Sequence, residues 1–98
     1  MDKKLQCENI FNALSNSSRL EIVRLLSERQ FCVNALVVRM NISQAAVSQH
    51  LKILENAGLV RKKKEGYWIH YTLVPKGFRI GYDFLTKIHE LKDKKAIP

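Results

Sequence analysis

The sequence lacks long apolar runs and has few cysteines. No apolar stretch approaches the roughly 18 residues needed to cross a bilayer, and the first residues do not resemble a signal peptide. The two cysteines, Cys7 and Cys32, are too few for a disulfide scaffold and lack a C-x-x-C spacing. We therefore expect a cytoplasmic protein with reduced thiols and no membrane partner.

The sequence also lacks the motifs of common enzymes. It has no glycine-rich phosphate loop and no metal-ligand cluster, and nothing places its serine, histidine and aspartate residues together as a triad. It contains no internal repeat, no low-complexity segment and no linker long enough to divide the chain. We predict a single domain over residues 1–98 that is not an enzyme.

Positive charge, in contrast, is abundant. Lysine and arginine number 17 against 9 acidic residues, which gives a formal net charge of +8. Apolar residues make up 46% of the chain, a share that favours folding over disorder. An excess of cations favours a polyanionic partner, because neutralising phosphates releases condensed counterions.

The periodicity of apolar residues predicts four helices, a β-hairpin and a last helix, in that order. Asp2 and Ser43 are placed to cap the first and fourth helices, and Gly58 is placed to end the fourth. The third and fourth helices form a helix-turn-helix unit. The fold class is thus mainly α with a β-hairpin wing (α+β), a winged helix-turn-helix. The expected helices are Lys3–Leu14, Ser18–Glu28, Val33–Met40, Gln44–Asn56 and Phe78–Lys92, and the strands are Leu59–Lys64 and Tyr67–Leu73 around a Glu65-Gly66 turn.

Four of the helices carry an apolar stripe at helical spacing. Each stripe marks a side of its helix that is expected to be buried. The stripe residues are Cys7, Ile10, Phe11 and Leu14; Ile22, Leu25 and Leu26; Val47, Leu51 and Leu54; and Gly81, Phe84, Leu85, Ile88 and Leu91.

The other side of the fourth helix carries short polar side chains suited to a DNA groove. Glutamine can pair bidentately with adenine, serine can donate or accept with any base, and an alanine methyl can touch a thymine methyl. Lysines on this helix and on the hairpin are suited to phosphates, which set affinity and register without specifying sequence. The candidate DNA contacts are Gln44, Ala45, Ser48, Gln49, Lys52, Lys62, Lys63 and Lys64.

Three other residues in this region have two interpretations each. His50 is either a hydrogen-bonded packing residue or a phosphate contact. Tyr67 and Trp68 either pack and anchor the hairpin or form a stacking platform for single strands.

The chain resembles the arsenic-repressor (ArsR/SmtB) family over about residues 5–75. The resemblance rests on Leu14–Leu26 (LSNSSRLEIVRLL), on Ser43–Leu54 followed by Gly58-Leu59-Val60, and on Lys64–Tyr71 (KEGYWIHY). It implies a homodimeric repressor that binds double-stranded DNA and leaves its operator when an inducer binds. The resemblance also implies a dimer interface on the first and last helices. Their apolar stripes are compatible with this, although the core of a monomer would produce the same pattern. By position, Gln44, Ala45, Ser48 and Gln49 match the DNA-contacting places of the family's helix.

The resemblance does not identify an inducer. Many relatives have a thiolate pair in a box that here reads Phe31-Cys32-Val33-Asn34, so the second cysteine is replaced by Asn34. A metal or metalloid ion, or a redox signal, at Cys7 and Cys32 remains one alternative, and buried structural thiols are the other. A second family site would use Asp83, His89 and Asp93, with Glu90 nearby, although a lone histidine beside acids is typical of a solvated surface.

Two other functions remain open from sequence alone. One is a winged-helix module that binds a protein through its last helix. The other is a DNA-binding regulator that responds to no signal.

Overall fold

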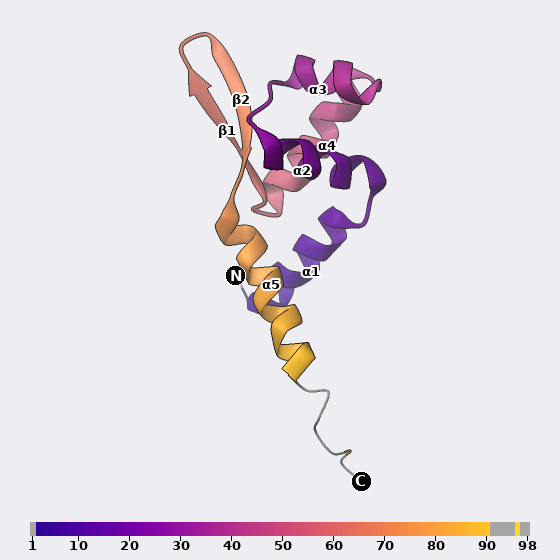
Figure 1. The fold of residues 1–98 in the computed structure, drawn as a ribbon, viewed down its shortest axis with the longest axis vertical. Coiled ribbons are helices and arrows are strands. Elements are labelled where there is room, and N and C mark those ends of the chain that lie inside the picture. Colours follow the sequence, from indigo (N-terminus) through magenta and orange to yellow (C-terminus); the bar gives the residue numbers. More distant parts are fainter. Residues whose placement is uncertain (1, 91–95, 97–98) are drawn as a thin grey trace.

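The computed structural model describes residues 2–90 and residue 96 of the chain. Figure 1 shows the hairpin, α3 and α4 at one end of the molecule, with α5 extending towards the other end. The predicted order and fold class are confirmed. The elements are α1 (Lys3–Leu14), α2 (Ser17–Glu28), α3 (Val33–Met40), α4 (Gln44–Asn56), β1 (Val60–Glu65), β2 (Trp68–Leu73) and α5 (Pro75–Glu90). No helix in this described part has the length and apolar content to span a bilayer.

Side-chain caps set the starts of three helices. The Asp2 carboxylate accepts a hydrogen bond from Lys4 N at 3.1 Å, and Ser43 Oγ accepts one from Ala46 N at 3.1 Å. Both predicted caps are confirmed. Helix α2 begins one residue earlier than expected, because Asn16 caps it and accepts from the backbone N–H of Arg19.

Helix α4 stops at the predicted glycine. Gly58 has a φ of +79°, in the left-handed region that glycine adopts without steric cost. The N–H of Leu59 donates to the carbonyl of Leu54, and the N–H of Gly58 donates to the carbonyl of Glu55, each at 3.0 Å. This pair of bonds is the Schellman motif, which satisfies the last carbonyls of the helix and turns the chain into β1.

The turn of the hairpin lies one residue later than predicted. Glu65 pairs with Trp68 in the antiparallel register, so the loop consists of Gly66 and Tyr67 rather than Glu65 and Gly66. Strand β1 accordingly runs from Val60 to Glu65, and β2 starts at Trp68. Gly66 has a φ of +63°, which the first position of a tight two-residue hairpin loop requires.

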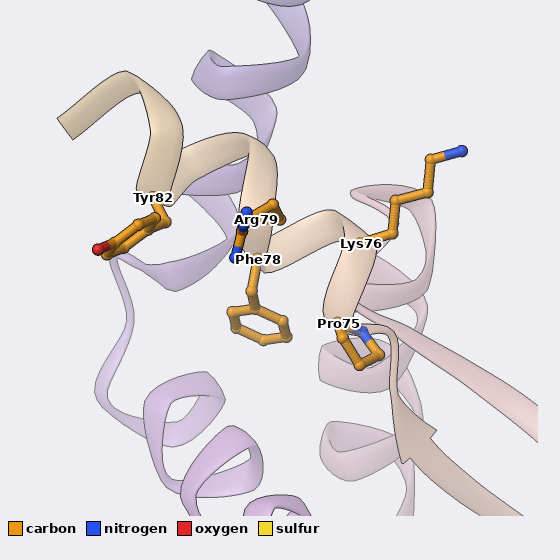
Figure 2. Close-up of a pocket in the computed structure, with 5 residues that line it drawn as sticks. All are labelled: Pro75, Lys76, Phe78, Arg79 and Tyr82. Atoms are coloured by element: carbon orange, nitrogen blue, oxygen red, sulfur yellow. The ribbon is translucent and has the colours of Figure 1, made fainter. Parts of the chain in front are cut away.

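Helix α5 begins at Pro75, three residues before the predicted start (Figure 2). Proline suits the first turn of a helix, because its φ is already helical and its missing N–H would have no partner there. The apolar stripe begins only at Phe78, so periodicity alone placed the start too late. The predicted end at Lys92 lies outside the described residues.

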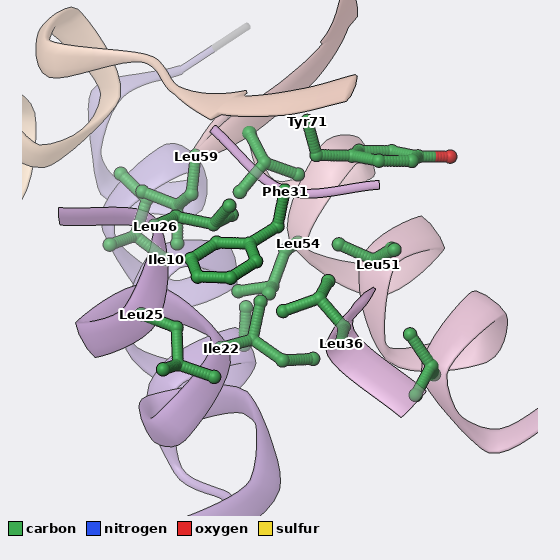
Figure 3. Packing of buried hydrophobic residues seen from close by; sticks show 13 residues of the cluster. Ile10, Ile22, Leu25, Leu26, Phe31, Leu36, Leu51, Leu54, Leu59 and Tyr71 are labelled. Atoms are coloured by element: carbon green, nitrogen blue, oxygen red, sulfur yellow. The ribbon is translucent and has the colours of Figure 1, made fainter. Parts of the chain in front are cut away.

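One apolar core joins the helices to the base of the hairpin. Phe31, in the connection between α2 and α3, extends its ring into the middle of this cluster (Figure 3). Its backbone also forms an isolated bridge to Tyr71, with N···O distances of 2.8 and 3.4 Å. A two-stranded hairpin is marginal in water, so this anchor and the burial of Val60 and Tyr71 hold the wing on the helices.

The predicted stripes are buried to different extents. Those of α2 and α4 are confirmed as core. In α1 the buried residues are Cys7, Ile10 and Ala13, whereas Phe11 and Leu14 are only half-buried. In α5 only glycines are buried, and the apolar residues Phe84, Leu85 and Ile88 are exposed. Leu91 lies outside the described residues.

Candidate nucleic-acid interface

Helix α4 presents a polar face that no other element of the described chain covers. Its opposite side is firmly held, since Val47, Leu51 and Leu54 are at most 1% exposed. The cap at one end and the glycine stop at the other fix its length at 13 residues, or about three and a half turns. All five predicted DNA contacts of this helix are exposed: Gln44 in the first turn, and Ala45, Ser48, Gln49 and Lys52 on the outer face.

This face has the chemistry for base edges in a major groove. Gln44 lies in the first turn, the part of such a helix that approaches base edges. The amides of Gln44 and Gln49 can each donate and accept at once, as bidentate pairing with adenine requires. The small side chains of Ala45 and Ser48 let the helix backbone approach closely.

A left-handed residue produces the short turn before α4. Asn41 ends α3 with a φ of +55°, a conformation that asparagine tolerates better than most residues. Ile42 and Ser43 complete the connection, and the fully buried Leu36 of α3 lies in the same core as the buried side of α4. The two helices therefore form the predicted helix-turn-helix.

A guanidinium from α2 links α4 to α1, and sequence analysis did not identify it. Arg19 Nη1 lies 3.4 Å from His50 Nδ1, and since a guanidinium only donates, the imidazole nitrogen accepts. Arg19 Nε donates to the Ala13 carbonyl at 2.6 Å, and Nη2 donates to the Asn12 carbonyl at 3.4 Å. One side chain thus connects three helices. His50 matches the packing interpretation, because it is half-buried and hydrogen-bonded.

The environment of His50 predicts a pH effect on stability. Burial, and secondly the positive charge of Arg19, lower the pKa of His50 below its ordinary value of 6.5. The unfolded chain therefore takes up a proton before the folded chain does as the pH falls. We expect the free energy of unfolding to be at its full value above about pH 7 and to decline as the pH falls through 6.5 towards the folded pKa.

Chemical denaturation of wild type and His50→Gln at pH 7.5, 6.5 and 5.5 measures this decline. Glutamine can accept from Arg19 but does not titrate, so His50→Gln should lose less stability over this range. His89→Gln removes an exposed imidazole from α5 and serves as the matched control. Equal slopes for wild type and His50→Gln would contradict the assignment.

The wing presents its cations on both faces. Lys62, Lys63 and Lys64 are all exposed, as predicted. The register pairs Lys62 with Tyr71 and Lys63 with His70, and side chains alternate along a strand, so Lys63 points to the face opposite Lys62 and Lys64. The Lys63 ammonium lies 3.7 Å from the Glu65 carboxylate. The three lysines therefore form two groups rather than one patch.

The aromatic residues at the tip of the hairpin, Tyr67 in the loop and Trp68 at the start of β2, are not packing groups. Tyr67 is fully exposed at 103%, and Trp68 is 65% exposed. The expectation that they anchor the wing is wrong, because the one-residue change of register puts Tyr67 in the loop itself. The anchor of the wing is instead Tyr71, which is buried against the core.

The two cysteines are held in different environments. Cys7 is buried in α1, with its Sγ 3.8 Å from the carbonyl of Ile80 in α5. Cys32 is half-buried at the start of α3 and makes no capping hydrogen bond. Within the part of the chain that the structure describes, no three His, Cys, Asp or Glu side chains gather closely enough for a metal ion. These residues of one chain do not fit the donor set that soft metals prefer, and we assign no metal or metalloid to them.

The acids and the histidine of α5 do not converge. Asp83 pairs with Arg79 in the same helix at 3.6 Å, and His89 is exposed. Asp93, the third residue of the predicted set, lies outside the described residues.

Arg79 also lies 5.9 Å from the ring centroid of Tyr82. Arg79 and Tyr82 border an open hollow of about 580 Å³ at the start of α5. Figure 2 shows that both side chains come from this one helix.

The apolar residues of α5 form an exposed face beside α1. Phe84, Leu85 and Ile88 are 44–53% exposed, and Leu5 of α1 is 45% exposed. Phe84 contacts the ring of Phe11 of α1, with a centroid distance of 5.9 Å. An exposed apolar face of this kind is typical of an interaction surface.

Together, the helix-turn-helix, the glycine stop and the cationic hairpin define a winged helix-turn-helix protein. Comparison with known proteins identifies the family. The model for bacterial regulatory proteins of the arsR family matches residues 16–62. An HTH-type transcriptional regulator of Methanocaldococcus jannaschii is 37% identical over 75 residues, which are 76% of this chain and 84% of that protein. The chain belongs to the arsR family, whose members are transcriptional regulators and not enzymes.

The share of each relative that the chain matches varies. The arsenical resistance operon repressor of Escherichia coli is 42% identical over 67 residues, which are 67% of this chain and 57% of that protein. Among solved structures, HlyU from Vibrio cholerae is 30% identical, with a TM-score of 0.70 over 93% of this chain and 96% of that one. An ArsR-like regulator from Rhodococcus is 28% identical, with a TM-score of 0.84 over 92% and 85%. The chain thus spans little more than half of the E. coli repressor.

Proposed function

We propose that the protein is a sequence-specific transcriptional repressor of ArsR type that binds double-stranded DNA as a homodimer. The observation that carries the proposal is the uncovered outer face of α4 beside a cationic wing. Relatives in the family include a protein named as a repressor and one named as an activator. Repression is the simpler mechanism, because a bound dimer excludes polymerase from the promoter without a further contact. The cytoplasm is the compartment in which such a protein meets its operator.

In this proposal residues 1–98 act as one domain, and α1 and α5 form the dimer interface. The exposed apolar face of α5 supports this arrangement, because a second copy would remove it from water. A twofold dimer presents its two α4 helices to half-sites about one helical turn, or roughly 34–36 Å, apart. The operator is therefore expected to be palindromic. The inducer, where one exists, stays unassigned.

Competition binding tests the proposed function. A labelled duplex from the region upstream of the protein's own gene is titrated at several salt concentrations, with random duplex as competitor. Binding should weaken steeply as salt rises and should survive an excess of random duplex. Equal displacement by random and specific competitor would rule out sequence-specific recognition. A stable complex with another protein and no duplex affinity would favour the interaction module instead.

A side chain that contacts a phosphate should affect DNA affinity differently from one that contacts a base. Lys64→Ala should weaken operator and random duplex to similar extents and lower the slope of log K against log salt by about 1. Lys87→Ala makes the same change of charge on α5, far from the wing, and should leave that slope unchanged. A sequence-dependent loss for Lys64→Ala would show that the lysine does more than bind a phosphate.

A further inference from the structure

Arg19, at the start of α2, closes the end of the neighbouring helix α1. The last four carbonyls of a helix have no partner within it, and those of Asn12 and Ala13 are two of these four in α1. Arg19 Nε and Nη2 donate to these two carbonyls. The backbone N–H and the Oγ of Ser15 also donate to the Asn12 carbonyl. The helix dipole favours a cation at this end, so the guanidinium suits the position in charge as well as in geometry.

The third nitrogen of the same guanidinium reaches a point on α4 that is sensitive to rotation of this helix. His50, which lies 3.4 Å from Arg19 Nη1, is on the flank of α4, between its buried side and its outer face. It directly follows Ser48 and Gln49, two of the predicted DNA contacts. Rotation of α4 about its axis would move all three side chains together. Apolar packing is non-directional, whereas a hydrogen bond requires a defined angle, so the bond from Arg19 restricts this rotation.

Further along α1, other side chains join this helix to α5. Cys7 Sγ lies 3.8 Å from the Ile80 carbonyl. The ring of Phe11 lies 5.9 Å from that of Phe84, measured between centroids. Helices α1 and α5 therefore form one packed unit, which in the proposed dimer contacts the same unit of the partner. The orientation of α4 relative to the twofold axis then depends on how α4 is connected to α1.

The two α4 helices of a dimer must fit two half-sites at once. Side chains that bind a specific partner tolerate deviations of only about 0.5 Å or 10–20° from their productive geometry. The duplex between the half-sites is stiff, so twisting or bending it to suit a misplaced helix costs free energy. A side chain that fixes α4 relative to α1 thus helps to determine which spacing of half-sites the dimer accepts.

We propose that Arg19 is a positioning residue for DNA binding, which fixes α4 to the dimer-forming helix α1 through His50 and so sets the half-site spacing that the protein recognises. Arg19 acts through the angle of α4 and not through a contact with a base. The inference rests on the proposed function, since it requires a dimer on an operator with two half-sites. It adds a source of specificity that lies outside the outer face of α4.

Substitutions at both ends of the Arg19–His50 bond test this role. His50→Leu removes the acceptor and keeps a side chain of similar size, and Arg19 can still close the end of α1. His50→Gln is the matched control, because the glutamine amide can accept from Arg19. Arg19→Lys keeps the charge at the end of α1, but one ammonium cannot span the carbonyls and His50, so it should behave like His50→Leu. Arg24→Lys makes the same change at an exposed arginine of α2 that pairs with Glu21, and should behave like wild type.

The measured quantity is the dependence of affinity on half-site spacing. Binding is compared between the operator of the competition experiment and the same duplex with one base pair inserted between its half-sites. The insertion rotates one half-site by roughly 35° relative to the other. Wild type and His50→Gln should lose roughly 10-fold or more in affinity on insertion. His50→Leu should bind the native operator roughly 3- to 30-fold more weakly, and should lose less than about 3-fold on insertion. Sedimentation velocity should give the same dimer mass for all variants.

The outcomes separate this inference from the proposed function. Specific operator binding by wild type, with the same spacing preference in His50→Leu, Arg19→Lys and His50→Gln, would overturn the inference alone. Loss by one constant factor at both spacings in His50→Leu would also overturn it, since His50 would then contact DNA itself. Dissociation of the dimer in His50→Leu would contradict it too, because the bond would then support the dimer rather than the angle of α4. Absence of specific duplex binding by wild type would overturn both.

Discussion

Replacing Gln44 with alanine is expected to weaken binding to the operator by about 1–3 kcal/mol, or roughly 5- to 150-fold. The amide lies exposed in the first turn of α4, where bidentate pairing with a base edge is possible. Alanine preserves the helix and leaves the cap at Ser43 intact, so the change removes only the base contact. Affinity for random duplex should hardly change, and fluorescence anisotropy with both duplexes measures the difference.

Gln30→Ala is the matched control for Gln44→Ala. It removes an exposed amide just before Phe31, outside α4, and should leave the ratio of operator to random affinity unchanged. A uniform loss for Gln44→Ala on every duplex would show that Gln44 contacts phosphate rather than bases.

Replacing Gly77 with alanine is expected to destabilise the fold by about 1–3 kcal/mol. A Cβ at this position would lie far inside van der Waals contact with the carbonyl oxygen of Gly58, and 3.3 Å from a methyl of Leu59. The obstructing atom belongs to the backbone that ends α4, so it cannot move without disturbing the Schellman motif. Urea denaturation measures the loss in the free energy of unfolding.

Gly81→Ala provides the comparison one helical turn later. Its Cβ would meet Ile10 and Phe11 at 3.5–3.7 Å, which is ordinary contact. Alanine also favours a helix over glycine by roughly 0.5–1 kcal/mol, so this variant should be as stable as wild type or more stable. If the two variants behaved alike, the close approach of α5 to the end of α4 would not determine stability.

Local sequence signals predicted most of the fold and the outer face of α4. The cap at Ser43, the stop at Gly58 and the apolar spacing between them act within one helix, so they fix its ends and its exposed side without tertiary information. The same spacing placed Ser48 and Gln49 on that side, and the cap at Ser43 placed Gln44 in the first turn. The start of a helix was predicted less accurately where its first turn lacks apolar residues at helical spacing, as in α5, which begins at Pro75.

The remaining features depend on contacts between distant segments. Whether the loop of the hairpin begins at Glu65 or at Gly66 depends on which residues pair, and one residue decides that Tyr67 is exposed at the apex. Arg19 binds carbonyls of α1 and a ring of α4, and neither partner is visible from its position in α2. The close approach of Gly77 to Gly58 is equally non-local.

Backbone amide chemical shifts, followed by NMR as operator duplex is added, test the central claim most directly. The proposed function predicts that the largest changes fall on the first turns of α4, around Gln44 to Gln49, and on Arg61–Ile69 of the wing. Helix α5 beyond its first turns should change little, because it extends away from these segments towards the other end of the molecule (Figure 1). Changes concentrated on α5, with α4 and the wing unaffected, would contradict the assignment of this surface to DNA.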